Sequence, residues 1–162
     1  MKLRLYFDTS VFGGVFDKEF QKISILLFDK VKSGEIICVY SNLCTAELNT
    51  APEKVRKFFM ELPKENMEFV EVSEEAYNLA QIYLDEKVVG KTSADDCRHI
   101  AVATISKVDF LVSWNFKHIV NIFKIRGYNS VNMRYGYVQL DIRSPKEIVN
   151  EDENTNNERK NF

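Results

Sequence analysis

Two polar side chains stand shortly after apolar segments of this sequence, where a catalytic or binding group is often placed. Asp8 directly follows the apolar run 3–7, and Asn115 closely follows the apolar run 110–112. Because ligands bind at the carboxyl ends of strands in an open parallel sheet, two such strands would place Asp8 and Asn115 on one rim. Asp8 also has a simpler interpretation, since aspartate often caps a turn with its carboxylate.

Asp95 and Asp96 begin a segment that is typical of a helix capped by Ser93. Acids are favourable in a first helical turn, and Ser93 with Asp96 resembles a capping box, so a structural role is open to both acids. The inward stripe of this helix, at about 100° per residue, centres on Cys97, Ala101, Thr104 and Val108. Asp96 lies at the edge of that stripe and Asp95 nearly opposite it. Asp96 is therefore the better candidate for a cleft, and Asp95 for an accessory position.

Glu47 and His99 are two further candidates. Apolar residues flank Glu47, which makes a simple surface role less natural, although capping or ion pairing remains an alternative. His99 follows Asp96 by three residues, so the two share a helix face. A histidine together with two carboxylates can bind zinc. However, neither His99 nor His118 belongs to an H-x-x-x-H or H-x-H pair, the spacing typical of histidine zinc ligands. We expect His99 to support a site or the core, and His118 to lie at the surface.

Other chemistries are disfavoured by what the sequence lacks. Ser10 is not part of a G-x-S-x-G nucleophile motif. Gly13 and Gly14 match neither G-x-G-x-x-G nor a P-loop, and we expect them to open a loop. The number of cysteines is odd and the sequence contains no C-x-x-C motif. Both facts argue against a disulfide framework and against a cysteine zinc site. The cysteines are Cys38, Cys44 and Cys97, expected as buried thiols.

The elements that must position these residues alternate between strand and helix patterns, which predicts βαβ units. Predicted strands cover 3–7, 36–40, 69–72 and 110–112, with a late strand around Val131. Predicted helices cover about 19–32, a segment capped by Ser41 or Asn42, about 52–62, a segment capped by Ser73, about 94–106, and a short piece near 117–122. We therefore expect an α/β protein with three layers, α/β/α, and a mainly parallel central sheet.

Length and composition favour one domain, because a chain of 162 residues can bury one core. We expect that domain at 1–149 and a disordered tail at 150–162, which is rich in Asn and charge and nearly free of apolar residues. The net charge of −2 is not that of a protein that coats nucleic acid, although it allows an enzyme that cuts it. Without an apolar run of about 18 residues or a signal-peptide core, a cytoplasmic location away from membranes is expected.

Four short segments together resemble the PIN-domain family of metal-dependent nucleases, which includes the VapC-type toxins of prokaryotic toxin–antitoxin pairs. The matching segments are YFDTSV at 6–11, TAEL at 45–48, DCRHIAVA at 96–103 and VDFLVSWN at 108–115. Each motif is short, and their order and spacing across about three quarters of the chain carry the resemblance.

The resemblance implies a metal site formed by Asp8, Glu47 and Asp96, with Asn115 at a fourth catalytic position. The family often has Asp at that fourth position. With Asn115 there, the resemblance implies that the side chain holds a ligand water or a substrate phosphate rather than binding the metal directly. The implied accessory residues are Thr9, Ser10, Asp95, His99 and Ser113. Mg²⁺ or Mn²⁺ is the expected cofactor, because hard carboxylate oxygens suit these cations better than zinc.

The implied activity is hydrolysis of RNA phosphodiesters, with an antitoxin protein as a partner and a homodimer as a further expectation. Basic candidates for contacts with the RNA backbone are Arg98, Lys117 and Arg126. One alternative is a catalytically weak binding module that keeps the fold, for which Asn115 is the hint. Another is a phosphohydrolase for small molecules, which the absence of a D-x-D start at Asp8 disfavours.

Overall fold

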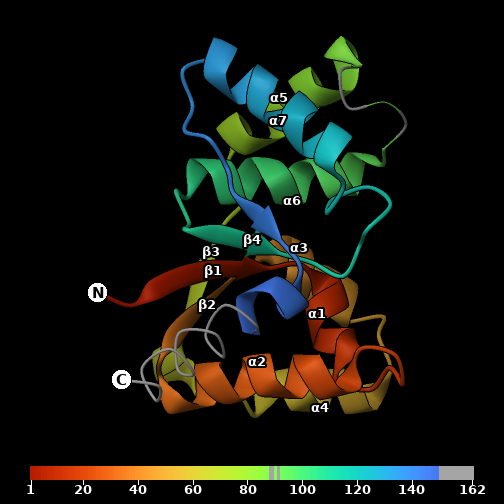
Figure 1. The fold of residues 1–162 in the computed structure, drawn as a ribbon, viewed down its shortest axis with the longest axis vertical. Coiled ribbons are helices and arrows are strands. Elements are labelled where there is room, and N and C mark those ends of the chain that lie inside the picture. Colours follow the sequence, from red (N-terminus) through yellow and green to blue (C-terminus); the bar gives the residue numbers. More distant parts are fainter. Residues whose placement is uncertain (88–89, 91, 150–162) are drawn as a thin grey trace, which may run out of the picture.

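A five-stranded parallel sheet separates two layers of helices (Figure 1). The computed structural model describes residues 1–87, 90 and 92–149. The strands are β1 (Leu3–Phe7), β2 (Ile36–Ser41), β3 (Met67–Val70), β4 (Phe110–Val112) and β5 (Ile142–Arg143). The helices are α1 (Thr9–Gly14), α2 (Gln21–Ser33), α3 (Asn42–Leu48), α4 (Glu53–Met60), α5 (Glu74–Glu86), α6 (Ala94–Ile105) and α7 (Ile122–Arg134), with a 3₁₀ turn, η1, at Lys64–Asn66. The predicted three-layer α/β/α class is confirmed, whereas the predicted tail 150–162 lies outside the described residues.

The order of the strands in the sheet is β3-β2-β1-β4-β5. The chain moves from β1 outward to β3, then returns to the other side of β1 for β4 and β5. The point of reversal therefore lies between β1 and β4, where open parallel sheets bind their ligands. Phe7 pairs with Val112 in register, and the Asp8 N–H donates to the Val112 carbonyl at 3.3 Å. This register places Asp8 and Ser113 next to each other at the carboxyl ends of the two strands.

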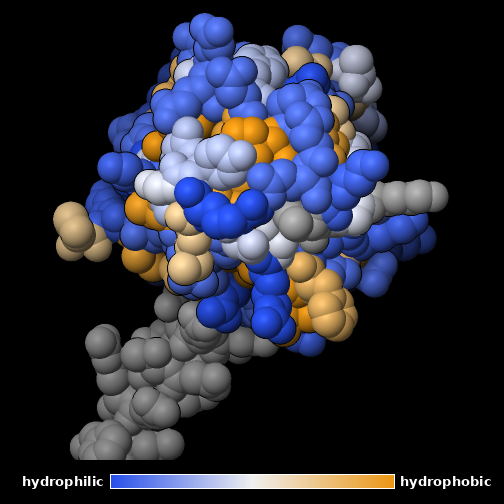
Figure 2. All heavy atoms as spheres, turned by 90° about the horizontal axis from the view of Figure 1, so that it is seen from above, coloured by the Kyte–Doolittle hydropathy of each residue, from blue (hydrophilic) through white to orange (hydrophobic). Residues whose placement is uncertain are grey.

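Each face of the sheet has its own hydrophobic core, because the side chains of a strand alternate between faces. Tyr6, Val39 and Leu111 face the layer of α5, α6 and α7, while Phe7 and Cys38 belong to the core shared with α1, α2 and α4. Strands covered on both faces are expected to be apolar nearly throughout, as β1 and β2 are. Seen from the side of α5 and α7, the outer surface is mostly hydrophilic (Figure 2).

Several predicted helix ends are confirmed by their hydrogen bonds. The side-chain oxygens of Ser41, Ser73 and Ser93 accept from backbone N–H groups in the first turns of α3, α5 and α6. Gly34 ends α2 in the left-handed conformation with φ 80°, which favours glycine. Among the described helices, none combines the length and apolar character needed to cross a membrane.

The predicted loop at Gly13 and Gly14 is wrong, because both residues belong to helix α1. Gly14 is required there by packing rather than by a turn. A Cβ at this position would lie 2.6 Å from the Ser24 Oγ and 2.7 Å from the Trp114 Nε1. The glycine thus permits α1 to approach α2 and the segment that follows β4.

Two strand predictions also need correction. The third strand is β3, Met67–Val70, so its start lies two residues before the predicted 69–72. Val131 is not in a strand but is buried in α7, and the last strand is β5. The short helix predicted near 117–122 is also wrong, because this segment forms turns and α7 starts only at Ile122, where the Asn121 side chain accepts from two backbone N–H groups. The β-branched Val131 suggested a strand, but the Asn121 cap and a buried helical face favour the helix.

Candidate active site

Asp8 is a buried carboxylate at the carboxyl end of β1, with 5% of its surface exposed. Its Oδ1 accepts from the Ser10 hydroxyl at 2.5 Å, and its Oδ2 accepts from the Ser113 hydroxyl at 2.6 Å. Asp8 stands at the N-cap position of α1, yet its side chain makes no capping hydrogen bond with this fully described helix. The simple turn-capping interpretation is therefore not what the structure has. Two serine hydroxyls, one from α1 and one from the residue after β4, orient the carboxylate instead.

The pKa of the Asp8 carboxyl is raised, chiefly by burial. The charge of His99 and the two serine hydrogen bonds lower this pKa, while the negative charge of Glu47 raises it further. The ionised form is thus held at a cost in free energy. A cation beside Asp8 would offset that cost, because an opposite charge favours the ionised form.

Glu47 projects from α3 and is half-buried. Its Oε1 lies 2.8 Å from the His99 Nε2 of α6. Burial by itself would raise the pKa of Glu47, but the hydrogen bond and the charge of His99 outweigh it, and the pKa is lowered. The structure therefore brings the candidate ligand Glu47 and the accessory candidate His99 together, across 52 positions of sequence.

His99 is buried, and its second ring nitrogen is also engaged. The His99 Nδ1 lies 2.7 Å from the Tyr6 hydroxyl, which lies 2.8 Å from the Ser41 Oγ. Burial would lower the pKa of His99, but neighbouring Cys44 and Glu47 and the charge of Asp8 raise it to about 10. An imidazolium can donate to Glu47 and to Tyr6 at the same time, which satisfies both ring nitrogens.

Tyr6 is the site residue that the sequence did not single out. In the sequence it is typical of an ordinary core position, because it lies inside the apolar run of β1. In the structure it is fully buried. A signal was present in its hydroxyl, since a buried tyrosine usually finds a polar partner. Nothing in the sequence identified that partner as His99.

Thr9 adds an unsatisfied polar atom to the site. Its Oγ1 is buried and finds no hydrogen-bond partner in proper geometry among the described residues. The same hydroxyl is close enough to Glu47 to contribute to lowering the pKa of that carboxyl. Buried polar atoms without partners are uncommon in native proteins and often mark a missing ion or water.

Asp95 and Asp96 occupy different environments at the start of α6. Asp95 is exposed and pairs with Arg98 at 3.0 Å, as expected for an accessory position. Asp96 is half-buried, and its charge adds to the rise that burial causes in the pKa of Cys97 and of Tyr128 in α7. The predicted difference in exposure between the two acids is thus confirmed. Arg98, one of the basic candidates, is the partner of Asp95 in this exposed ion pair.

The three carboxylates are not gathered into one ready ligand cluster. Within residues 1–87, 90 and 92–149, no three His, Cys, Asp or Glu side chains are grouped so that they could hold a metal ion. The charge of Glu47 raises the already burial-raised pKa of Asp8, and the charge of His99 acts on both carboxyls. Their carboxylate oxygens and the unsatisfied Thr9 hydroxyl are hard donors, the kind of ligand that Mg²⁺ or Mn²⁺ prefers.

Asn115 lies on the same rim as Asp8, as predicted from the strand ends. The Asn115 N–H donates to the Ser113 Oγ at 2.9 Å, and this Oγ in turn donates to Asp8. The Asn115 Oδ1 accepts from the His118 N–H at 3.0 Å. The side-chain oxygen thus stabilises the turn after β4, which leaves the amide nitrogen as the group available for donation.

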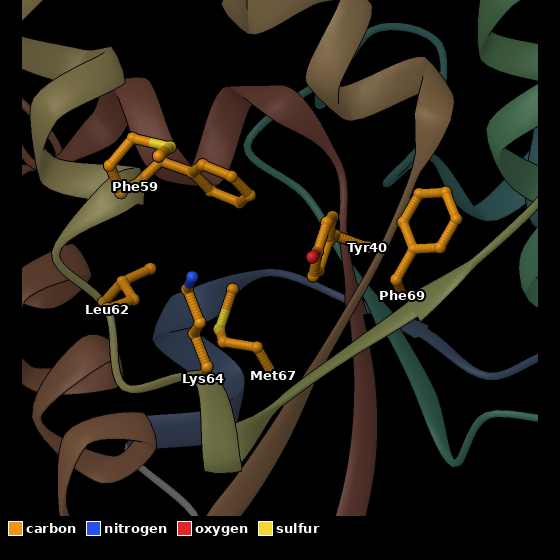
Figure 3. A pocket seen from close by; sticks show the side chains of 7 residues that line it. Tyr40, Phe59, Leu62, Lys64, Met67 and Phe69 are labelled. Atoms are coloured by element: carbon orange, nitrogen blue, oxygen red, sulfur yellow. The ribbon is translucent and has the colours of Figure 1, made fainter.

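A hollow of about 400 Å³ lies elsewhere, between α4, η1 and the strands β2 and β3 (Figure 3). Its lining consists of Tyr40, Phe59, Met60, Leu62, Lys64, Met67 and Phe69. The described lining thus offers one ammonium group and one phenol in an otherwise apolar wall. The described lining of this hollow contains no carboxylate that could hold Mg²⁺ or Mn²⁺, so the rim with Asp8 is the candidate site.

Comparison with solved structures finds the same architecture in several proteins. VapBC2 from Rickettsia felis, solved bound to a DNA fragment from its promoter, gives a TM-score of 0.58 at 13% identity over 88% of this chain and 98% of that one. VapC20 from Mycobacterium tuberculosis, a sarcin–ricin loop cleaving toxin, gives 0.56 at 13% identity over 85% and 98%. FitAcB from Neisseria gonorrhoeae gives 0.55 at 11% identity over 87% and 97%. The chain therefore has the three-layer α/β/α fold of PIN domains.

Two comparisons at the level of sequence found no match. No protein-family model matches the chain, and no curated protein matches it. At 11–13% identity the solved structures establish the fold alone.

Proposed function

We propose that this protein is a metal-dependent endoribonuclease that hydrolyses RNA phosphodiesters. The observation that carries the proposal is the placement of Asp8. It is buried, oriented by Ser10 and Ser113, and located where the strand order reverses, with the charges of Glu47 and His99 close by. A carboxylate held in this way, at a cost in free energy, is typical of a functional site.

Asp8, Glu47 and Asp96 are the proposed ligands of the cation, with Thr9 supplying a nearby hydroxyl. Asp96 is included because it lies one helical turn from His99 on α6, at the half-buried edge of that helix. A bound Mg²⁺ or Mn²⁺ would lower the pKa of a coordinated water and offset negative charge on the phosphate. His99 keeps one oxygen of Glu47 in place by donating to it.

Asn115 is proposed to bind the substrate rather than the cation. Its side-chain oxygen already accepts from the His118 N–H, so its amide nitrogen can donate to a phosphate oxygen. The family resemblance, in which this position is often an Asp, leads to the same assignment. Lys117, exposed and two residues further on, is the basic group best placed to meet the RNA backbone.

An antitoxin is the proposed protein partner. The support is the fold, which this chain shares with VapC20, described as a toxin, and with VapBC2, solved on promoter DNA. A toxic ribonuclease of this kind would be silenced by a partner protein made beside it, and a homodimer is proposed as its assembled form. A small reading frame next to the gene, whose product binds this chain and inhibits it, would support this role.

The deciding experiment is cleavage of a panel of RNAs by the full-length protein with Mg²⁺ or Mn²⁺. We expect cleavage that a chelator abolishes and that Asp8→Asn and Asp96→Asn each reduce by at least about 100-fold, since even residues that only support metal ligands matter by 10- to 100-fold. Activity that is unchanged in both variants, or that persists in excess chelator, would contradict the proposal.

A binding module with the same fold is the second candidate. It is favoured by the lack, among the described residues, of a three-residue metal cluster. If RNA binds tightly and no RNA or DNA is cleaved at any metal concentration, this candidate replaces the first. Turnover of small phosphoesters alone would instead indicate a phosphohydrolase.

A further inference from the structure

Three aromatic side chains gather beside the rim that holds Asp8. Phe20, which precedes α2, stacks on Trp114 with ring centroids 4.2 Å apart and an interplanar angle of 19°. Phe116 meets the edge of this pair, 6.0 Å from the Trp114 centroid and 6.5 Å from that of Phe20. Trp114 is nearly buried at 8% exposure, whereas Phe116 is 50% exposed. The cluster therefore has a fixed base and an exposed aromatic edge.

The base of this aromatic cluster, Trp114 with Phe20, is held in place by polar contacts as well as by stacking. The Trp114 Nε1 donates to the Ser24 Oγ of α2 at 2.9 Å, and its backbone N–H donates to the Ser10 Oγ at 2.9 Å. Gly14 leaves the space that the indole ring occupies, because a Cβ there would lie 2.7 Å from the Nε1. A ring fixed in this way loses little conformational freedom when a ligand packs on the cluster.

The same hydrogen bonds connect the aromatic cluster to the proposed catalytic carboxylate. Ser10 accepts from the Trp114 N–H and donates to Asp8, and Ser113 donates to Asp8 from the residue before Trp114. Phe116 follows Asn115, the proposed phosphate contact, and its own N–H donates to the Trp114 carbonyl at 3.0 Å. The exposed ring of Phe116 thus follows the proposed phosphate contact directly in the chain.

Resting on the proposed ribonuclease function, we propose that Phe116, supported by Trp114 and Phe20, stacks an unpaired base adjacent to the scissile phosphate. An exposed aromatic ring beside a phosphate site is the arrangement by which proteins bind single-stranded nucleic acid, because every base has a face that can stack. Bases of a duplex are already stacked on each other and cannot reach the ring. The substrate is accordingly a single-stranded segment, such as a loop or an end, and Phe116 contributes affinity with little preference among bases.

The sequence contains a single tryptophan, which makes the subsite directly observable. The full-length Asp8→Asn protein is titrated with a single-stranded oligoribonucleotide, and the emission of Trp114 is followed together with the dissociation constant. We expect the emission to change on binding. Phe116→Ala should weaken binding by about 5- to 150-fold, the range found for alanine at stacking aromatics, while Phe116→Tyr should bind as the parent does.

Phe69→Ala is the matched control, because Phe69 is equally exposed at 52% but lies on β3, at the sheet edge away from β4. It should leave both the affinity and the Trp114 emission unchanged. The same RNA sequence annealed to its complement should bind more weakly and change the emission less. Wild-type affinity in Phe116→Ala, or equal binding of the duplex, would overturn the stacking subsite.

The outcomes separate this subsite from the nuclease proposal. Cleavage by the wild type with an unaltered KM in Phe116→Ala would overturn the stacking subsite and leave the nuclease intact. Binding that depends on Phe116 in a protein that never cleaves RNA would support the subsite and contradict the nuclease.

Discussion

At the scale of single residues, charge and hydrogen bonding define the site more sharply than the types of residue do. Asp8, Glu47 and His99 place two carboxylates and one imidazole near each other in a largely buried region. Burial disfavours the charged form of each group, and the neighbouring groups decide in which direction its pKa finally shifts. For Asp8 burial prevails and the pKa is raised. For Glu47 the contact with His99 prevails and the pKa is lowered, and for His99 the neighbouring Cys44 and Glu47 prevail and the pKa is raised.

The first prediction concerns the cost of the Asp8 charge. A group whose pKa is raised on folding adds stability below its unfolded pKa and loses it as the pH rises, so at neutral pH ionised Asp8 opposes folding. Asp8→Asn should therefore keep or increase the free energy of unfolding at pH 7 while abolishing cleavage. Urea unfolding of the metal-free proteins measures this, and a loss of stability at pH 7 in Asp8→Asn would contradict the assignment.

The second prediction concerns His99 in the metal-free protein. Its pKa is about 10 in the fold, against about 6.5 in an unfolded chain. Between these values the folded state holds one more proton, so raising the pH across this window should reduce the free energy of unfolding. In His99→Gln, which can still donate to Glu47, this part of the pH dependence should vanish. Identical slopes from pH 7 to pH 10 in both proteins would show that His99 is neutral in the fold.

At the scale of elements, the short helix α1 decides how closely the two sides of the site approach each other. It starts directly after Asp8 and contains Ser10. At Gly14 it packs closely against Ser24 and Trp114. The serine caps of α3, α5 and α6 were readable from the sequence because a cap is a local interaction over a few residues. The role of Gly14 was not, because the atoms it must avoid come from α2 and from the segment after β4.

The third prediction uses the two glycines of α1. Gly14→Ala should destabilise the protein by about 1–3 kcal/mol, because the new methyl group overpacks against Ser24 and Trp114. Gly13→Ala is the matched control, since a Cβ there would meet no described atom within 4 Å. Alanine is the better helix former by about 0.5–1 kcal/mol, so Gly13→Ala should be neutral or stabilising. Urea unfolding checks both, and equal effects at the two positions would contradict the packing argument.

At the scale of the whole molecule, the order of the strands brings the candidate residues to one rim. β1 and β4 are neighbours only because the chain reverses direction across the sheet after β3. That reversal unites Asp8 with Ser113, 105 positions later in the sequence. Binding of a cation at this rim would therefore connect elements from both halves of the chain and stabilise the fold as a unit.

The fourth prediction follows from that coupling. A ligand that binds only the folded state raises its stability, by about 2.7 kcal/mol at 100 times the dissociation constant. Mg²⁺ or Mn²⁺ should thus raise the melting temperature of the wild type, and the rise should be lost in Asp8→Asn and Glu47→Gln and reduced in Asp96→Asn. Asp95→Asn is the control, because Asp95 is exposed and pairs with Arg98. A rise that is the same in all variants would place the cation elsewhere.

The sequence alone determined what depends on local patterns. The alternation of apolar runs and helical periodicities predicted the α/β class, the strand ends at Asp8 and Ser113, and the different exposure of Asp95 and Asp96. These features follow from interactions between residues a few positions apart. The same local reasoning failed at Val131, where a β-branched residue belongs to a helix, because packing within the tertiary structure outweighs weak propensities.

The tertiary structure alone decided which side chains meet. Glu47 and Tyr6 contact His99 from 52 and 93 positions away, and these contacts depend on the order and register of the strands. It also changed the picture of the metal site. The resemblance joined Asp8, Glu47 and Asp96, whereas the structure couples Asp8 and Glu47 through His99 and leaves Asp96 at the edge of α6. Contacts between distant residues are set by the global fold, and a sequence pattern carries no direct record of them.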